Sequence, residues 1–203
     1  MTTFKKPLFN LILCFSIFCF AFAHKAAAQT PHNQVNKKGQ KEGKWIYFYP
    51  DSTVSAVEFY KADQLDGKLT TYYPNGQLKS DELWQKGLLE GRATYFFENQ
   101  QVEKMGSYLN GFYHGQWTFY HENGKKKRAG SYQFGIPEGE WCFYDHKGRP
   151  LEKGLFSEGM RQGKWQYFSK KGIVRFYAFF DQNKDTVWYK VHKDGRTTLI
   201  NDK

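Results

Sequence analysis

The sequence predicts an all-β protein, an elongated antiparallel array of about six and a half β-hairpin repeats in one twisted sheet. Aromatic residues make up 19% of the 203 residues, and there are 19 glycines but only 6 prolines. Glycine at this density disfavours helices, because each Gly inside a helix costs about 1 kcal/mol relative to Ala. Glycines and aromatic residues also recur every 24 residues. The aromatic content excludes a disordered chain, and the glycine spacing excludes collagen.

The first 28 residues are typical of a secretory signal peptide. Lys5 and Lys6 precede an apolar segment at 8–23, which is followed by small residues up to Ala28. We expect cleavage after Ala28, with a site after Ala23 as the alternative. An uncleaved membrane anchor is disfavoured because the apolar segment is shorter than the ~20 residues of a transmembrane helix. The chain is therefore predicted to be exported to the periplasm, the outer envelope or the medium.

Export changes the charge and the cysteine count. Removal of residues 1–28 lowers the net charge from +10 to +7, with 27 basic and 20 acidic residues left, and Cys142 becomes the only cysteine. One thiol cannot form an intramolecular disulfide or a Cys-based metal site. Residues 29–41 are polar and lack aromatic side chains, so we expect a flexible linker there.

An internal repeat organises residues 42–200. Six units begin at glycines 24 residues apart, and a degenerate seventh begins near residue 186. We number each position by its offset from the first Gly of its unit. Offset 2 holds Trp in four units, and offset 17 is always aromatic. The unit glycines are Gly43, Gly67, Gly91, Gly115, Gly139 and Gly163; the tryptophans at offset 2 are Trp45, Trp117, Trp141 and Trp165; the aromatic residues at offset 17 are Tyr60, Trp84, Tyr108, Tyr132, Phe156 and Phe180.

Each unit is predicted to contain two strands and two turns. Offsets 0 to 6, as in 115–121, alternate with a period of two and favour a first strand. Asn-Gly at 75–76 and 123–124 predicts a hairpin turn, because both residues tolerate positive φ. A second strand should run from about offset 11 to offset 17, and a turn near offset 20, as at 110–111, leads to the next unit. One hairpin cannot bury its own aromatic face, so the units should stack into a sheet of about 13 strands.

A short motif recurs at the start of several units: Gly-Lys-Trp-Ile-Tyr-Phe-Tyr at 43–49, Gly-Gln-Trp-Thr-Phe-Tyr at 115–120 and Gly-Lys-Trp-Gln-Tyr-Phe at 163–168. With Asn-Gly-Lys at 123–125 and Tyr-x-x-Gly at 108–111, these segments resemble the bacterial variant of the MORN repeat (membrane occupation and recognition nexus). The resemblance extends over residues 42 to about 200.

The sequence departs from the repeat pattern at four positions. Leu69 and Ala93 stand where Trp is expected, and Ser52 and Gln100 replace a turn Gly. The resemblance implies an elongated hairpin array used for binding, with no catalytic residues. Proteins with this variant are often labelled as antitoxins of toxin–antitoxin systems, a label that is hard to reconcile with export.

No catalytic or metal-binding motif occurs in the sequence. His121 and Asp145 share offset 6, but adjacent units would hold them roughly 10 Å apart, too far for a hydrogen bond or a shared metal ion. Cys142 aligns with threonines at offset 3, which indicates a strand residue and not a nucleophile. Neither a nucleophile motif nor a phosphate-binding Gly loop is present. We therefore expect a protein that is not an enzyme and that binds no cofactor or metal.

Basic residues form two candidate sites for a polyanion. One set follows the unit glycine at offset 1, and the other is a run of four cations in the fourth unit. Acidic residues often precede the same glycines, so a mixed-charge solvent face is the competing interpretation. On a strand the run alternates faces, so at most two or three of its cations could meet one anionic surface. The candidates are Lys44, Lys68, Arg92 and Lys164 at offset 1, and Lys125, Lys126, Lys127 and Arg128 in the run.

The sequence thus predicts an exported binding or scaffolding module with a protein partner in the cell envelope. Edge strands and aromatic stripes would supply the contacts. Binding of anionic lipid or glycan at the envelope is one alternative, and neutralisation of a toxin is another. Nucleic acid fits an exported protein poorly. Aromatic ladders could stack on sugars, but offsets 2, 4 and 17 are expected to form the packed face of the sheet.

Overall fold

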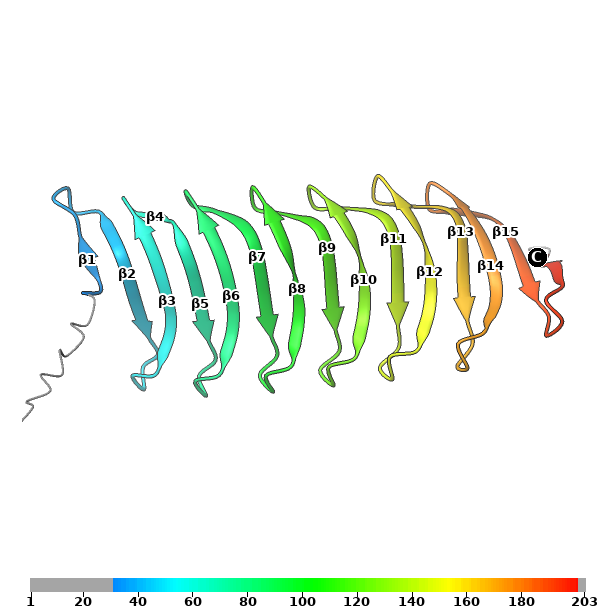
Figure 1. Cartoon of the computed structure of the whole chain (residues 1–203), viewed down its shortest axis with the longest axis horizontal. Coiled ribbons are helices and arrows are strands. Elements are labelled where there is room, and N and C mark those ends of the chain that lie inside the picture. Colours follow the sequence, from blue (N-terminus) through cyan, green and yellow to red (C-terminus); the bar gives the residue numbers. More distant parts are fainter. Residues whose placement is uncertain (1–30, 201–203) are drawn as a thin grey trace, which may run out of the picture. The chain divides into compact units, whose positions relative to one another are not determined.

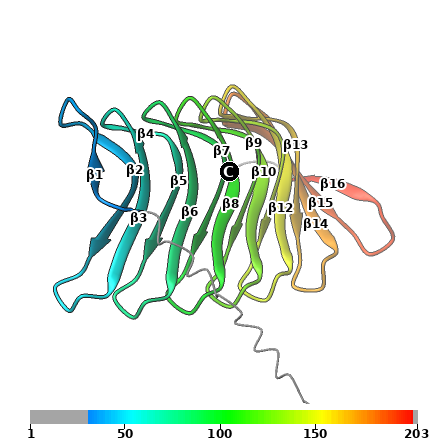
Figure 2. The ribbon, with the colours of Figure 1, turned by 60° about the vertical axis from the view of Figure 1, so that its left-hand side comes forward.

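The computed structural model describes residues 31–200; the predicted signal peptide at 1–28 lies outside these residues. They form one antiparallel sheet of 16 strands, which confirms the predicted all-β hairpin array. Successive hairpins lie side by side in a single row (Figure 1), and the same row is seen from a second direction in Figure 2. This part of the chain contains no helix long and apolar enough to span a membrane.

The strands follow one another in space in the order of the chain, except that the short β4 pairs with β3 beside this path. The strands are β1 (Gln34–Val35), β2 (Lys41–Phe48), β3 (Val54–Lys61), β4 (Gln64–Leu65), β5 (Gly67–Tyr72), β6 (Leu78–Gln85), β7 (Leu88–Phe96), β8 (Val102–Leu109), β9 (Phe112–Tyr120), β10 (Lys126–Gln133), β11 (Ile136–Tyr144), β12 (Pro150–Ser157), β13 (Met160–Phe168), β14 (Val174–Asp181), β15 (Lys184–Val191) and β16 (Thr197–Ile200).

The sheet begins earlier than the repeat pattern indicates. Strand β1 lies inside the stretch 29–41 that the sequence predicts to be a flexible linker, and it pairs with β2 through Gln34 opposite Glu42. The Asn33 side chain also accepts a hydrogen bond from the backbone N–H of Ile46 at 2.7 Å. This part of the predicted linker is therefore attached to the first hairpin, because backbone pairing does not need the aromatic residues that the stretch lacks.

The unit glycine lies where pairing between neighbouring units changes register. All six have positive φ, from 64° at Gly163 to 128° at Gly67. Opposite Gly91, for example, the register between β6 and β7 shifts between Glu82 and Trp84. A residue with positive φ in such a bulge is normally Gly, because other residues are strained there. The 24-residue glycine spacing therefore records a bulge at Gly91, Gly115, Gly139 and Gly163.

A tryptophan from each of three units lies flat on a glycine of the unit before it. A Cβ atom added to Gly106, Gly130 or Gly154 would lie 2.2 Å from the Cδ2 atom of the indole. Any side chain larger than hydrogen at offset 15 would therefore displace the ring. The tryptophans are Trp117, Trp141 and Trp165, which are only 0–2% exposed.

The same three indoles make two further contacts with the preceding unit. Each Nε1–H donates to the carbonyl of offset 16, at 2.8 Å from Trp117 to Ser107, and at 3.1 and 3.2 Å in the next two units. Each ring also meets the aromatic residue at offset 17 edge-on, with centroids 5.0 to 5.2 Å apart. Edge-to-face pairs of this kind add about 0.5–1.5 kcal/mol beyond area burial. We call this set of contacts the Trp–Gly interlock.

Two earlier units use a different pairing at the same place. Where Leu69 and Ala93 replace Trp, offset 15 of the preceding unit is Glu58 or Glu82 instead of Gly. The Glu58 carboxylate accepts a hydrogen bond from the Tyr60 hydroxyl at 2.5 Å, and Glu82 accepts one from Trp84 Nε1 at 2.9 Å. A residue smaller than Trp at offset 2 thus leaves room for a carboxylate that binds the aromatic side chain on its own strand.

The interlock predicts a strong coupling between Gly130 and Trp141. Gly130→Ala should lower the free energy of unfolding by about 1–3 kcal/mol, because the new methyl group meets the indole. Trp141→Ala should lower it by about 3–5 kcal/mol. In the double variant the loss of unfolding free energy should be smaller than the sum of the two single losses by at least about 1 kcal/mol, since the methyl group then has no ring to displace.

Urea unfolding followed by far-UV circular dichroism measures these differences. As a control, Gly130→Ala combined with Trp45→Ala in the first unit should give additive losses within about 0.5 kcal/mol. Additive losses for the Gly130 and Trp141 pair as well would refute the interlock.

Candidate functional site

The face of the sheet that carries offsets 2, 4 and 17, here called the Trp face, is largely closed by its own side chains. Trp117, Trp141 and Trp165 are buried as the sequence predicts, whereas Trp45 and Trp84 are half-buried. Cations lie over the remaining rings: Lys104 Nζ is 4.2 Å from the Tyr95 centroid, and the Arg161 guanidinium is 4.0 Å from the Trp165 centroid. Cation–π contacts of this kind stabilise by about 0.5–1 kcal/mol or more. The indole rings are therefore unavailable for stacking on a sugar.

The offset-1 cations do not form a continuous row on the opposite face. Lys68 pairs with Asp81 at 2.9 Å, and Lys164 Nζ lies 3.5 Å from the Tyr177 ring centroid. In the fifth unit the offset-1 residue is Glu140, which pairs with Lys153 at 2.8 Å. Lys44 lies opposite Phe59, and Arg92 opposite Ser107. This pattern of local pairs favours the mixed-charge interpretation of that face.

The run of four cations is split by the strand. Lys125, Lys126 and Lys127 are exposed, whereas Arg128 is half-buried. The Arg128 guanidinium lies 4.2 Å from the Phe119 ring centroid on the Trp face, and its Nε is buried without a hydrogen-bond partner in the described chain. At most three of the four cations can therefore meet an anionic surface together.

The histidine, aspartate and cysteine singled out in the sequence have structural surroundings. A ring nitrogen of His121 lies 3.2 Å from the carbonyl oxygen of Tyr144 in the next unit. Asp145 binds its own turn: its carboxylate accepts hydrogen bonds from the backbone and the guanidinium of Arg149, at 3.0, 2.8 and 2.6 Å. Cys142 is a half-buried residue of β11 opposite Lys153. Residues 31–200 hold no cluster of three His, Cys, Asp or Glu side chains suited to a metal ion.

Some exposed apolar side chains, such as Leu83 and Leu155, lie within strands, and another set lies where one unit joins the next. The turns after β6, β8 and β10 lie on one edge of the sheet, at the top in Figure 1. Four large apolar residues in or directly after these turns are 49–55% exposed. Phe112 lies beside the turn of the next unit, because a Cβ atom on Gly135, next to Phe134, would lie 3.4 Å from Phe112 Cδ1. The four residues, here called the turn-edge row, are Leu88, Phe112, Phe134 and Ile136.

Phe134 occupies a position that opposes its side chain. Its φ is +48°, in the left-handed region, where the equivalent residue one unit earlier is Asn110 with φ +52°. A bulky residue is rare at such φ values, whereas Asn is enriched there. The exposed aromatic side chain of Phe134 therefore does not stabilise this turn.

A hydrogen bond of neighbouring turns is also absent at Phe134. In two neighbouring units, a Glu directly before the unit glycine accepts a hydrogen bond from the backbone N–H at offset 19. The Asn110 N–H donates to Glu90 at 2.9 Å, and the Glu158 N–H donates to Glu138 at 3.0 Å. The equivalent residue for Phe134 is His114. Its Nδ1 is buried without a hydrogen-bond partner among the described residues, and its ring centroid lies 5.3 Å from that of Phe134. Within residues 31–200, the turn at Phe134 thus lacks a hydrogen bond that equivalent turns make.

The turn-edge row was not among the sites predicted from the sequence. Its members follow the alignment of the units, since Leu88, Phe112 and Ile136 all occupy offset 21 and Phe134 occupies offset 19. Their exposure could not be inferred from the apolar pattern alone, because offset 21 resembles a strand position. The available signal was a large aromatic residue at offset 19, where the other units have Ala, Lys, Asn, Glu or Gln.

Comparisons with known proteins agree with the repeat assignment. The family model described as MORN repeat variant matches residues 65–86 and 113–133, which confirms the resemblance at two repeats. None of the curated proteins matches the sequence.

Two solved structures show weak similarity. The GtfA/B complex bound to UDP and GlcNAc is 12% identical, over 55% of this chain and 21% of that chain, with a TM-score of 0.22. The TcdB2-TccC3-Cdc42 structure is 11% identical, over 76% of this chain and 12% of that chain, with a TM-score of 0.17. TM-scores this low do not establish a shared fold.

The Asp145 turn predicts an unusual titration. Hydrogen bonds from the Arg149 side chain and backbone lower the pKa of the Asp145 carboxyl to about 2, from the usual 3.8. A lowered pKa stabilises the folded protein above the unfolded value, and this contribution is lost as the pH falls from about 4 through about 2. Carboxyl chemical shifts measured by NMR should give a midpoint of about 2, and Arg149→Gln should move it toward 3.8.

The Asp51 carboxyl serves as a control for this titration. Hydrogen bonds from the Thr53 side chain and backbone lower its pKa, so Arg149→Gln should leave the Asp51 midpoint unchanged. An Asp145 midpoint near 3.8 in the unmodified protein would contradict the observed turn geometry.

Proposed function

We propose that this protein is an exported, non-enzymatic binding module that holds a protein partner of the cell envelope on its turn-edge row. The exposed apolar row supports this proposal. Contiguous exposed apolar patches mark interaction sites, and aromatic side chains dominate the energetics of protein interfaces. The match to the MORN repeat variant supports a repeat binding module in general terms.

The backbone of Phe134 adds a second support. A left-handed conformation costs about 1–2 kcal/mol for a residue other than Gly, Asn or Asp. Every other unit also holds a residue other than Gly in this conformation at offset 19, as at Lys86 and Glu158, but Phe134 is the one aromatic side chain among them. A partner that docks onto Phe134 would account for an aromatic residue at this costly position.

Contacts along this edge suit a protein partner better than a sugar or a lipid headgroup. The row presents Leu, Phe and Ile side chains from three successive units, and the charged residues beside it include both a cation, Lys86, and an anion, Glu90. A polar glycan or a charged headgroup would leave these apolar groups unmatched. The offset-1 cations, which suggested anionic ligands, are divided among local pairs with Asp81 and Tyr177 and an interruption at Glu140.

Phe134→Asn should separate stability from binding. We expect the free energy of unfolding in urea to rise by about 0.5–1 kcal/mol, because Asn adopts the left-handed conformation at lower cost than Phe. The same change should weaken binding of the partner at least tenfold, since a central aromatic contact is removed. A loss of stability would contradict the assigned turn conformation.

The partner is sought by affinity capture from the native envelope fraction at low and high salt, with the protein as bait. The proposal expects one stoichiometric protein that survives high salt and is lost with the combined variant Phe112→Ser, Phe134→Asn. Leu155→Ser is the matched control. Leu155 is 49% exposed but lies within strand β12, away from the turns, so this variant should retain the partner. Equal capture by all three proteins, or recovery of lipid or polysaccharide alone, would overturn the proposal.

A further inference from the structure

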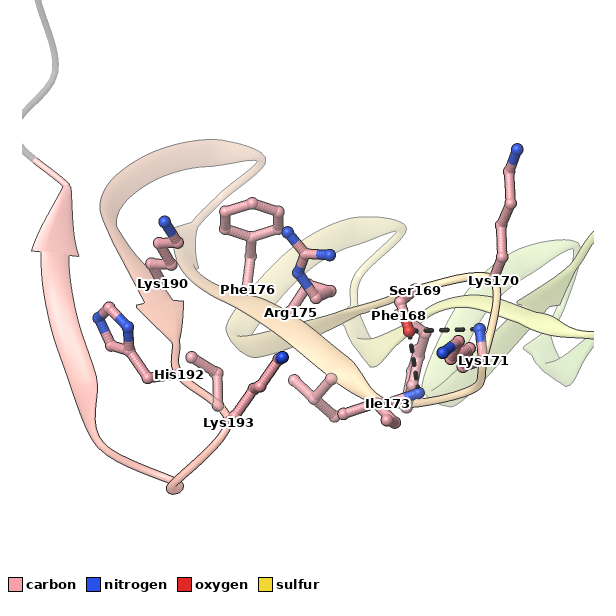
Figure 3. A pocket seen from close by; sticks show the side chains of 12 residues that line it. Phe168, Ser169, Lys170, Lys171, Ile173, Arg175, Phe176, Lys190, His192 and Lys193 are labelled. Atoms are coloured by element: carbon pink, nitrogen blue, oxygen red, sulfur yellow. Dashed lines mark hydrogen bonds between the residues drawn. The ribbon is translucent and has the colours of Figure 1, made fainter.

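A hollow opens at the other edge of the sheet, near the C-terminal end of the described residues. Strands β14 and β15 pair only as far as Phe176 opposite Lys190. Beyond this pair the chains diverge toward the turns at 169–172 and 192–195, and a hollow of about 1040 Å³ lies between them (Figure 3).

Elsewhere along this edge, side chains connect one turn to the next. The Tyr49 hydroxyl donates to the Tyr72 carbonyl and the Tyr73 hydroxyl to the Phe96 carbonyl, both at 2.7 Å. The equivalent residue at the hollow is Ser169, whose Oγ instead accepts the backbone N–H groups of Lys171 and Ile173, both at 3.3 Å (Figure 3). No hydrogen bond within residues 31–200 joins the turn at 169–173 to the turn at 192–196.

The hollow is lined by cations without acidic partners. Its lining contains five Lys or Arg residues and His192, and no Asp or Glu. None of the five is in an ion pair within the described part of the chain, whereas Arg149, Arg161 and Arg196 nearby are all paired. A concentration of one charge sign attracts ligands of the opposite sign. The five cations are Lys170, Lys171, Arg175, Lys190 and Lys193.

Apolar side chains lie between these cations. Ile173, Val174 and Val191 line the hollow, and Ile173 is 62% exposed. The ligand should therefore carry an apolar group as well as negative charge, since specific sites combine apolar lining with a few oriented polar groups.

We propose that this hollow binds an acidic peptide segment that carries an apolar side chain as an anchor. The apolar anchor would contact Ile173 and Val191, and carboxylates on either side of it would pair with Lys171, Arg175 and Lys193. The site is on the opposite edge from the turn-edge row, so it is a second contact surface, independent of the proposed function (Figure 1).

The arrangement favours a peptide over other anions. The cations come from two different turns and from β14 and β15, and Lys170 points away from the others in Figure 3. They are thus spread out, whereas a single phosphate needs donors that converge on one point. Adjacent units are roughly 10 Å apart, about the length of three extended residues, so carboxylates along a peptide can reach both turns. An acyl chain would remain largely in water beside the exposed Ile173.

Fluorescence anisotropy of a labelled probe peptide tests the proposal directly. The probe is Glu-Glu-Leu-Phe-Glu-Glu, compared with Gln-Gln-Leu-Phe-Gln-Gln and with Glu-Glu-Ser-Ser-Glu-Glu. We expect saturable binding of the first probe to the protein at low salt, and at least tenfold weaker binding of each of the other two. No binding of the first probe at low salt, or equal binding of all three, would overturn the proposal.

Charge-reversal variants locate the binding site. The triple variant Lys171→Glu, Arg175→Glu, Lys193→Glu should bind the first probe at least tenfold more weakly than the unmodified protein. Ile173→Ser alone should weaken binding several-fold. The triple variant Lys125→Glu, Lys126→Glu, Lys127→Glu changes the net charge equally on exposed residues of the fourth unit and should bind normally. Equal weakening by both triple variants would show non-specific attraction and refute the site.

Two further measurements separate this proposal from the alternatives. Phe134→Asn should bind the first probe normally, so loss of the envelope partner and loss of the peptide site can be distinguished. Vesicles containing phosphatidylglycerol should sediment equally little of the unmodified protein and of the triple variant Lys171→Glu, Arg175→Glu, Lys193→Glu, here called the hollow variant. Vesicle binding that is abolished by the hollow variant, together with no probe binding, would assign the site to a lipid headgroup instead.

Discussion

The Trp–Gly interlock is the contact on which the rest of this fold depends. A single sheet has no second layer to cover it, so its apolar face must be shielded by side chains of the sheet itself. A tryptophan lying flat on a glycine of the preceding hairpin achieves this, since Trp141 covers the backbone at Gly130, binds the Ser131 carbonyl and meets Tyr132 edge-on. Each such contact joins two units, so stability propagates between neighbours as expected for a repeat array.

This use of the aromatic residues determines which surfaces remain for binding. The Trp face is closed by its rings and by cations such as Lys104 and Arg161 that lie over them. The opposite face carries local ion pairs, as between Lys68 and Asp81. The turns are under fewer constraints, because they need only a suitable backbone conformation. The two distinctive surfaces accordingly lie on the two turn edges, one apolar and one basic, and each occurs where a contact made by equivalent turns is missing.

Much of the fold could be predicted from the sequence, because the repeat fixes which residues are equivalent. The 24-residue glycine spacing, the Asn110-Gly111 turn and the burial of Trp117 all follow from local pattern. The partner of each tryptophan could not be inferred, because it depends on the register between strands of different units. The alternative pairing of Glu82 with Ala93 was missed for the same reason. The basic hollow could not be predicted either, because it depends on two turns that no side chain of residues 31–200 connects, since Ser169 Oγ bonds within its own turn.

Amide hydrogen exchange of the free protein tests the interlock most directly. The units beginning at Gly67 and Gly139 are each one unit in from an end of the six-unit array, but only the latter is joined to both neighbours by a Trp–Gly interlock. The account predicts that amides of β11 and β12 exchange at least tenfold more slowly than those of β5 and β6, since exchange from paired strands reports local opening. Equal protection of the two units, or slower exchange in β5 and β6, would contradict it.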